Sequence, residues 1–219
     1  MSGRQYRPSL IGVMGYLLDP GLCTGCGQTL RPLQHFCSVC RATLECINHA
    51  CILCGLENHS NDATCPACLY DPPRWQRLIA PLIYRGFSRD LLIQLKFNAS
   101  LHLANSLVTR LIEHFRQGAA VPQVLIPVPL HQKRLIERGY NQAFEIANII
   151  SRQLNIPIDT LALQRIRDTE SQRGLSAAQR EKNIVKAFKV VSELKYAHVA
   201  VIDDIITTGS TANEVTKTL

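Results

Sequence analysis

The sequence predicts an α/β fold, with a mainly parallel sheet and flanking helices, preceded by a small cysteine-rich domain. Two observations lead to this prediction. Segments typical of strands and of helices alternate over residues 78–219, a pattern that favours a parallel sheet covered by helices. All nine cysteines lie between positions 23 and 68, and eight of them form C-x-x-C pairs, in a stretch too short for a large apolar core. We therefore expect two domains, 1–70 and 78–219, joined by the Pro-rich linker 71–77.

The net positive charge comes entirely from residues 76–219. Residues 1–75 hold five basic and five acidic side chains, whereas residues 76–219 hold nineteen and twelve, which gives the net charge of +7. A basic surface is typical of proteins that bind pyrophosphates or nucleic acids. Ordinary solvated lysine and arginine side chains are the alternative.

No apolar run is long enough to span a bilayer. The segment Ser9–Leu18 is apolar but short, and it reaches Asp19-Pro20 without a small-residue cleavage site. We interpret it as a short packing helix before the first cysteines rather than a signal peptide. The sequence therefore predicts a cytoplasmic protein.

The cysteines form four C-x-x-C pairs at regular spacing. These pairs are Cys23/Cys26, Cys37/Cys40, Cys51/Cys54 and Cys65/Cys68. Two such pairs supply the four thiolates of a tetrahedral zinc site; a disulfide framework is the alternative, which a cytosolic chain would not normally keep. Gly27 follows the first pair and Gly55 the third, so the pattern repeats every 28 residues. We predict two sequential structural zinc ribbons rather than a cross-braced pair, with the metals supplying folding free energy.

The second domain is expected to alternate strands with helices. Strand patterns occur at 78–87, 123–129, 158–166, 187–191 and 198–202. Helical patterns occur in two segments between Leu91 and Phe115, then at Asn141–Leu154, at Ser176–Asn183 and after Gly209. In open α/β sheets, ligands bind beyond the carboxyl ends of the strands, so the segments that follow these strands are the candidate site.

The strongest candidate follows the strand Val199–Ile202. Two acids, Asp203 and Asp204, come first, and a small polar segment then opens a helix. That segment comprises Thr207, Thr208, Gly209, Ser210 and Thr211. Backbone N–H groups at a helix N-terminus bind phosphate, and the hydroxyls add donors. Paired carboxylates beside such a cradle would bind sugar hydroxyls or a metal, so a ribose 5-phosphate fits both parts. The alternative is a polar turn whose hydroxyls only cap the helix.

Two further polar segments fall where the same crevice would lie. After the strand at 123–129, Lys133, Arg134 and Arg138 could reach a pyrophosphate, and Gly139 allows a close backbone approach; a surface loop with a helix cap at Asn141 is the alternative. Residues 165–183 carry few large apolar side chains and are either a mobile lid or an ordinary exposed connection. The candidate lid residues are Arg167, Ser171, Gln172, Arg173 and Arg180.

The motifs in this order resemble the competence protein F (ComF) family, whose relatives include the GntX-type proteins. They are the C-x-x-C ribbons, Leu92–Phe97, Pro127–Leu130 with Arg138–Gln142, Arg167–Thr169 with Ser171-Gln172, Leu175-Ser176 and Arg180, and the stretch 198–215. The last resembles the phosphoribosyl-pyrophosphate (PRPP) signature of type I phosphoribosyltransferases. The resemblance implies a type I phosphoribosyltransferase fold for the second domain. It also implies that Asp203 and Asp204 bind the ribose hydroxyls, that Thr207–Thr211 bind the 5-phosphate, and that Mg²⁺ is bound with PRPP. Domains of this kind usually continue past the signature helix with another strand, so we expect this chain either to be truncated at Leu219 or to be naturally short.

The resemblance implies a cytoplasmic competence protein that handles incoming single-stranded DNA during natural transformation, with a PRPP-binding domain. Other DNA-uptake or recombination proteins are expected partners. An active phosphoribosyltransferase that moves ribose 5-phosphate to a nitrogen acceptor is the alternative, but no residue is identified as a general base. A metal-dependent scaffold for partner proteins is a third possibility, because the ribbons carry no net charge.

Overall fold

The computed structural model describes residues 21–31, 34–47, 49–60, 62–97, 104, 108–109, 111–113, 115, 120–169 and 176–219. These residues form two compact units, one ending at Leu44 and the other spanning Glu45–Leu219, and each is described by itself. The helix expected at Ser9–Leu18 lies outside the described residues. Among the helices that are described, none combines the length and the apolar character needed to cross a bilayer.

The two cysteine ribbons repeat each other in backbone structure. In the first unit, a bridge joins Leu22 to Thr29 and a short helix follows, α2 (Ser38–Ala42). In the second unit, the equivalent bridge joins Ala50 to Glu57, and the equivalent helix is α3 (Pro66–Tyr70). Corresponding residues are 28 positions apart, so the sequence period is also a structural period.

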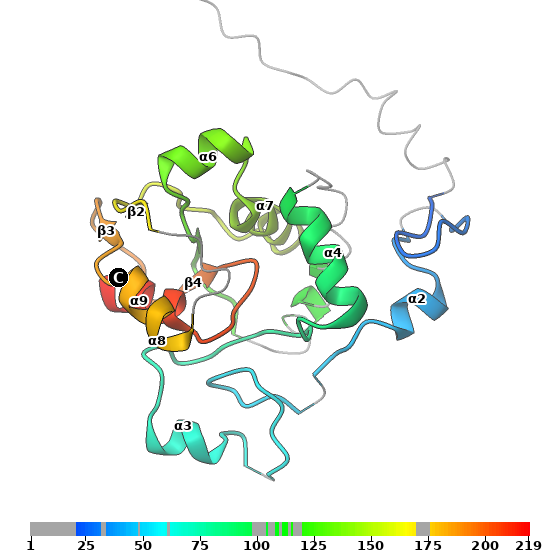
Figure 1. The fold of residues 1–219 in the computed structure, drawn as a ribbon, viewed down its shortest axis with the longest axis horizontal. Helices are drawn as coiled ribbons and strands as arrows, with labels where there is room; N and C mark the ends of the chain where they lie inside the picture. Colours follow the sequence, from blue (N-terminus) through cyan, green and yellow to red (C-terminus); the bar gives the residue numbers. More distant parts are fainter. Residues whose placement is uncertain are drawn as a thin grey trace, which may run out of the picture. The chain divides into compact units, whose positions relative to one another are not determined.

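The second unit continues into an α/β region (Figure 1). Its described elements, in chain order, are α4 (Gly86–Phe97), β1 (Val124–Pro127), α6 (Gln132–Arg138), α7 (Gln142–Leu154), β2 (Leu163–Arg165), α8 (Ala177–Ile184), β3 (Phe188–Val190), β4 (Val199–Ile202) and α9 (Ser210–Thr218). Between α4 and β1, the described residues 104, 108–109, 111–113 and 115 are helical, as the periodicity predicts.

The strand β1 lies at the centre of the parallel pairing. It pairs with β4 in parallel, with Val124 opposite Val199 and Pro127 opposite Ile202. On its other side, Leu125 forms a parallel bridge to Ile158, within the stretch predicted as a strand. All four residues of β1 are buried, as expected for a strand covered on both faces.

The core joins the strands to the helices that follow them. The helix α7 buries Ala143, Ile146, Ala147 and Ile150, which recur at the spacing of one helix face. Asn141 caps this helix, because its side chain accepts a hydrogen bond from the Ala143 N–H at 3.1 Å. The core cluster comprises Val124, Ile126, Val128, Ala143, Ala162, Leu163, Ile184, Ala187, Phe188 and Val215.

Three expectations for the fold require correction. The segment 78–87 does not form an extended strand. Within it, residues 81–83 form a short antiparallel pairing with residues 45–47. Gly86, with a φ of +49°, begins α4. The strands β2 and β3 form an antiparallel pair rather than part of the parallel sheet. The basic segment after β1 is helical, as α6, and not a loop.

Candidate functional site

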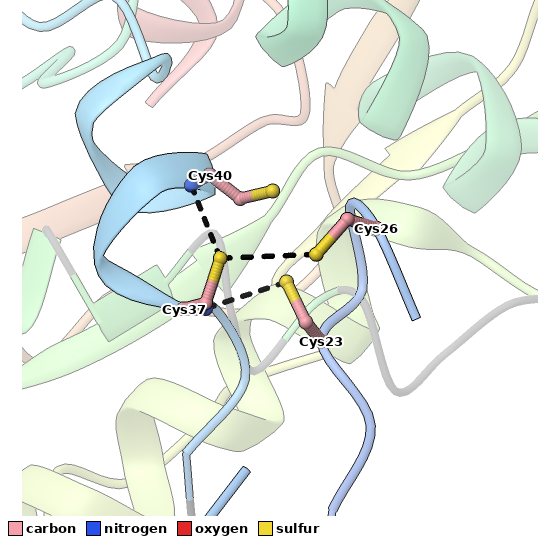
Figure 2. Close-up of side chains that lie close together, drawn as sticks. All are labelled: Cys23, Cys26, Cys37 and Cys40. Atoms are coloured by element: carbon pink, nitrogen blue, oxygen red, sulfur yellow. Dashed lines mark hydrogen bonds between the residues drawn. The ribbon is translucent and has the colours of Figure 1, made fainter. Parts of the chain in front are cut away.

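Each group of four cysteines gathers its sulfur atoms in the space of one metal ion. Within a group, all four Sγ atoms lie within 4.8 Å of one another. We call these groups the first quartet (Cys23, Cys26, Cys37 and Cys40) and the second quartet (Cys51, Cys54, Cys65 and Cys68). Figure 2 shows the four side chains of the first quartet converging on one point. These are the quartets that the 28-residue period predicts. Four thiolates at such distances can coordinate one zinc ion tetrahedrally.

The same backbone turn supports both quartets. The Gly27 N–H donates to the Cys23 carbonyl at 2.8 Å, and the Gly55 N–H donates to the Cys51 carbonyl at the same distance. Both glycines have a φ near +70°, which residues with a Cβ rarely adopt. Backbone N–H groups of the turn, those of Leu53 and Cys54, are directed at Cys51 Sγ, and the Cys65 N–H of the partner pair lies 3.3 Å from the same sulfur.

The thiols in a quartet differ strongly in acidity. Burial opposes ionisation of Cys23 and Cys51, but backbone N–H groups directed at their sulfurs lower each pKa to about 6. Burial and the neighbouring thiols raise the pKa of Cys40 to about 12 and also raise that of Cys68. Four thiolates therefore do not ionise together without a cation, and a bound dication would displace protons from the less acidic thiols.

The acidic pair and the small polar segment lie at the carboxyl end of β4. Asp203 is exposed and Asp204 is half-buried, and the Asp203 carboxylate accepts a hydrogen bond from the Asp204 N–H at 2.9 Å. The segment Thr207–Thr211, called the signature loop below, turns at Gly209, which has a φ of +74° and is the N-cap of α9. Thr208 and Ser210 share a hydrogen bond of 2.7 Å between their hydroxyls. The helix N-terminus therefore opens at the sheet edge where ligands bind in α/β folds.

The basic residues of α6 lie at the same edge of the sheet. The reason is that α6 follows β1, which runs parallel to β4. Lys133 Nζ lies 3.2 Å from Asp168, and Arg134 donates a hydrogen bond of 2.6 Å to the Thr169 carbonyl. Arg138 donates to the Gln142 side chain at 2.9 Å. The pairing with Lys133 lowers the pKa of Asp168. Gly139 has a φ of +78° and ends α6, so its role here is to close the helix.

Arg165, at the end of β2, lies among these charged groups. It donates a hydrogen bond to the Thr169 hydroxyl and stacks over the Phe188 ring, 5.6 Å from its centroid. Burial lowers the pKa of Arg165 and the positive charge of Arg134 lowers it further, whereas the Asp203 and Asp168 carboxylates raise it. Arg165 therefore connects the electrostatics of α6 with those of Asp203 at the end of β4.

A side chain in the described part of the expected lid contacts the signature loop. Arg180, in α8, donates a hydrogen bond of 3.2 Å to the Thr207 hydroxyl. Arg167 instead donates to the Val185 carbonyl. Ser176 and Gln179 form a capping box that begins α8, so this end of the segment is ordered helix. Ser171, Gln172 and Arg173 lie outside the described residues.

Two arginine side chains have a buried donor without an acceptor in the described part of the chain. These donors are the Nε atoms of Arg165 and Arg180. Buried donors are almost always hydrogen-bonded in folded proteins. Arg180 contacts the signature loop, and Arg165 lies within electrostatic reach of Asp203. An anionic ligand fits this donor set.

The sequence could not identify Arg165 individually, although it lies in the expected lid segment. A basic residue at the end of a predicted strand was the available signal, but the stacking on Phe188 depends on the β2–β3 pairing. Trp75, in the linker, was also missed; its ring lies against Gly209.

The chain resembles bacterial proteins of two names. It is 36% identical over 170 residues to a DNA utilization protein YhgH of Shigella flexneri, covering 75% of each chain. It is 35% identical over 170 residues to the Escherichia coli K12 protein of that name, again covering 75% of each. It is 32% identical over 212 residues to competence protein F of Haemophilus influenzae, covering 93% of this chain and 86% of that one. No protein-family model matches, and no solved structure matches.

The quartets predict a pH-dependent metal content. We expect the purified chain to bind two zinc ions, one per quartet, and to release them as the solution is acidified. Protons compete with the metal for the thiolates, so apparent affinity falls with decreasing pH. Elemental analysis gives the stoichiometry, and a zinc-sensitive dye follows release.

The odd cysteine provides the matched control. Cys46 lies outside both quartets, so Cys46→Ser should keep two zinc ions, whereas Cys54→Ser should lose one. Equal zinc content in Cys54→Ser and the unaltered chain would contradict the assignment.

Proposed function

Because the chain belongs to the competence protein F family, we propose that it acts in DNA uptake and use, and that its α/β region binds PRPP at the signature loop. The names of its relatives support the first part. The second part is supported chiefly by one observation: Arg180 donates a hydrogen bond to Thr207, which brings α8 to a helix N-terminus at the carboxyl end of a parallel strand.

The proposed roles follow from the chemistry of the residues. Backbone N–H groups of the signature loop take the 5-phosphate, because they lie at the N-terminus of α9, where the helix dipole favours an anion. Asp203 and Asp204 take the ribose hydroxyls, since a carboxylate accepts hydrogen bonds from neighbouring hydroxyls. Mg²⁺ bound with the pyrophosphate would supply positive charge beside these carboxylates.

The pyrophosphate is proposed to face the basic residues of α6 and β2. Lys133 is 72% exposed, so its pair with Asp168 contributes little to stability and can be exchanged for a phosphate at small cost. Arg134 and Arg165 are half-buried, and a guanidinium in such a place binds phosphate with geometric specificity. The repulsion between these two cations, which lowers the pKa of Arg165, would be relieved by a bound polyanion.

Transfer of the ribose 5-phosphate to a nitrogen acceptor is the enzymatic alternative. A candidate proton-transfer group exists in His131, whose Nδ1 lies 3.6 Å from Asp168 at the same sheet edge. Pyrophosphate release in the presence of nucleobases would establish turnover. Binding without release would leave PRPP as a ligand that regulates DNA handling.

The acidic pair should be essential for PRPP affinity. Replacing both residues (Asp203→Asn with Asp204→Asn) removes two charged acceptors, and we expect the affinity to fall by about 100-fold or more in titration calorimetry. Glu193→Gln is the control, because Glu193 is exposed in the connection that precedes β4, at the opposite end of that strand. Unchanged affinity in the double variant would rule out this site.

The contact from α8 should contribute to binding in a measurable way. Arg180→Gln keeps a polar side chain but removes the charge beside Thr207, so PRPP affinity should fall by about 10-fold. Lys182→Gln removes an exposed charge from the same helix and should have no effect. An equal loss in both variants would show that only net charge matters.

Single-stranded DNA should bind through electrostatic contacts with the phosphate backbone. The net charge of +7 predicts that affinity falls steeply with salt, with a slope that counts the phosphates neutralised. Replacing Lys133 and Lys182 by Gln should reduce that slope. A salt-independent gel shift would contradict electrostatic binding.

A further inference from the structure

The second quartet and the signature loop both contact one linker residue, Trp75. On the quartet side, the indole Nε1–H donates to the carbonyl of Leu53, which lies between Cys51 and Cys54. The neighbouring Ile52 carbonyl accepts a hydrogen bond of 2.8 Å from the Leu78 N–H. The two carbonyls of the turn therefore bind Trp75 in the linker and Leu78 just after it.

The same turn packs closely against the residue that follows the linker. A Cβ added at Gly55 would lie 2.9 Å from Leu78 Cδ2, so the Leu78 side chain lies against the backbone of the turn. Gly55 also has a φ of +70°, which favours glycine at this position.

On the loop side, the Trp75 ring covers Gly209. A Cβ added at Gly209 would lie 2.9 Å from Trp75 Cη2, so the ring is in direct contact with the backbone of the signature loop. Gly209 is buried, although Thr207 and Thr208 beside it are exposed. The preceding residue, Arg74, donates its backbone N–H to Asn213 in α9 at 3.4 Å. The linker therefore contacts both the loop and the helix whose N-terminus the loop opens.

We infer that Trp75 is a positioning residue, which couples metal binding at the second quartet to the conformation and phosphate affinity of the signature loop. The ribbon around the second quartet is too short to build a large apolar core of its own, so we expect its turn to depend on the metal. Without metal, the Leu53 carbonyl loses its fixed position and the indole loses its acceptor. The ring then no longer holds Gly209 in the left-handed conformation that begins α9.

The coupling works in both directions. A ligand that tightens the signature loop must, by linkage, raise metal affinity at the second quartet by the same factor. The identity of the ligand, PRPP, rests on the proposed function, whereas the coupling between metal and loop does not. The first quartet belongs to the other compact unit and supplies the comparison.

The natural fluorescence of the chain reports on this contact, because Trp75 is its only tryptophan. Removing zinc from the Cys23→Ser/Cys26→Ser chain, which keeps only the second quartet, should shift the Trp75 emission to longer wavelength. The Cys51→Ser/Cys54→Ser chain should show the shifted emission from the start. An emission unaffected by metal at the second quartet would overturn the inference, whether or not PRPP binds.

Zinc release measures the coupling to the ligand. PRPP with Mg²⁺ should lower the zinc dissociation constant of the second quartet by about 5-fold or more, measured with a competing dye, and should leave that of the first quartet unchanged. Trp75→Phe keeps a ring against Gly209 but lacks the indole N–H, and should abolish most of this effect while the chain stays folded by circular dichroism. Full coupling in Trp75→Phe would overturn the role of Trp75. If the unaltered chain binds no PRPP, the proposed function fails, and the emission experiment still decides the metal coupling.

Discussion

The parallel pairing of β1 with β4 sets the position of the whole candidate site. Because the two strands run in the same direction, the segments that leave Pro127 and Ile202 begin at one edge of the sheet. One segment becomes α6, with its basic side chains, and the other becomes the signature loop. The pairing rests on buried residues of β1, which pack against α7 and α9. The charged groups therefore meet because an apolar core brings their strands together.

A second constraint comes from the metal-binding turns. The ribbon of the second quartet belongs to the same compact unit as the α/β region, through the 45–47 pairing with 81–83 and the linker contacts of Trp75. A small segment with little apolar core is an unusual support for the signature loop, since its stability would depend on a metal at the second quartet. The loop would then be fully formed only in the metal-bound chain.

Local patterns predicted the parts of the structure that depend on local chemistry. The cysteine period identified the quartets, and the apolar face of α7 identified that helix and its Asn141 cap. The helix α6 was missed because Leu135 and Ile136 are exposed, so no apolar face marks it. The antiparallel β2–β3 pair, the place of Arg165 and the contact of Trp75 with Gly209 depend on residues distant in sequence, which no local pattern encodes.

A crystal structure of the zinc-loaded chain with PRPP and Mg²⁺ tests the central claim most directly. The account predicts the 5-phosphate on the backbone N–H groups of Thr208–Thr211, the ribose hydroxyls on Asp203 and Asp204, and the pyrophosphate facing Arg134 and Arg165. Trp75 should remain against Gly209 in that structure. PRPP bound elsewhere, or absent at saturating concentration, would contradict the account.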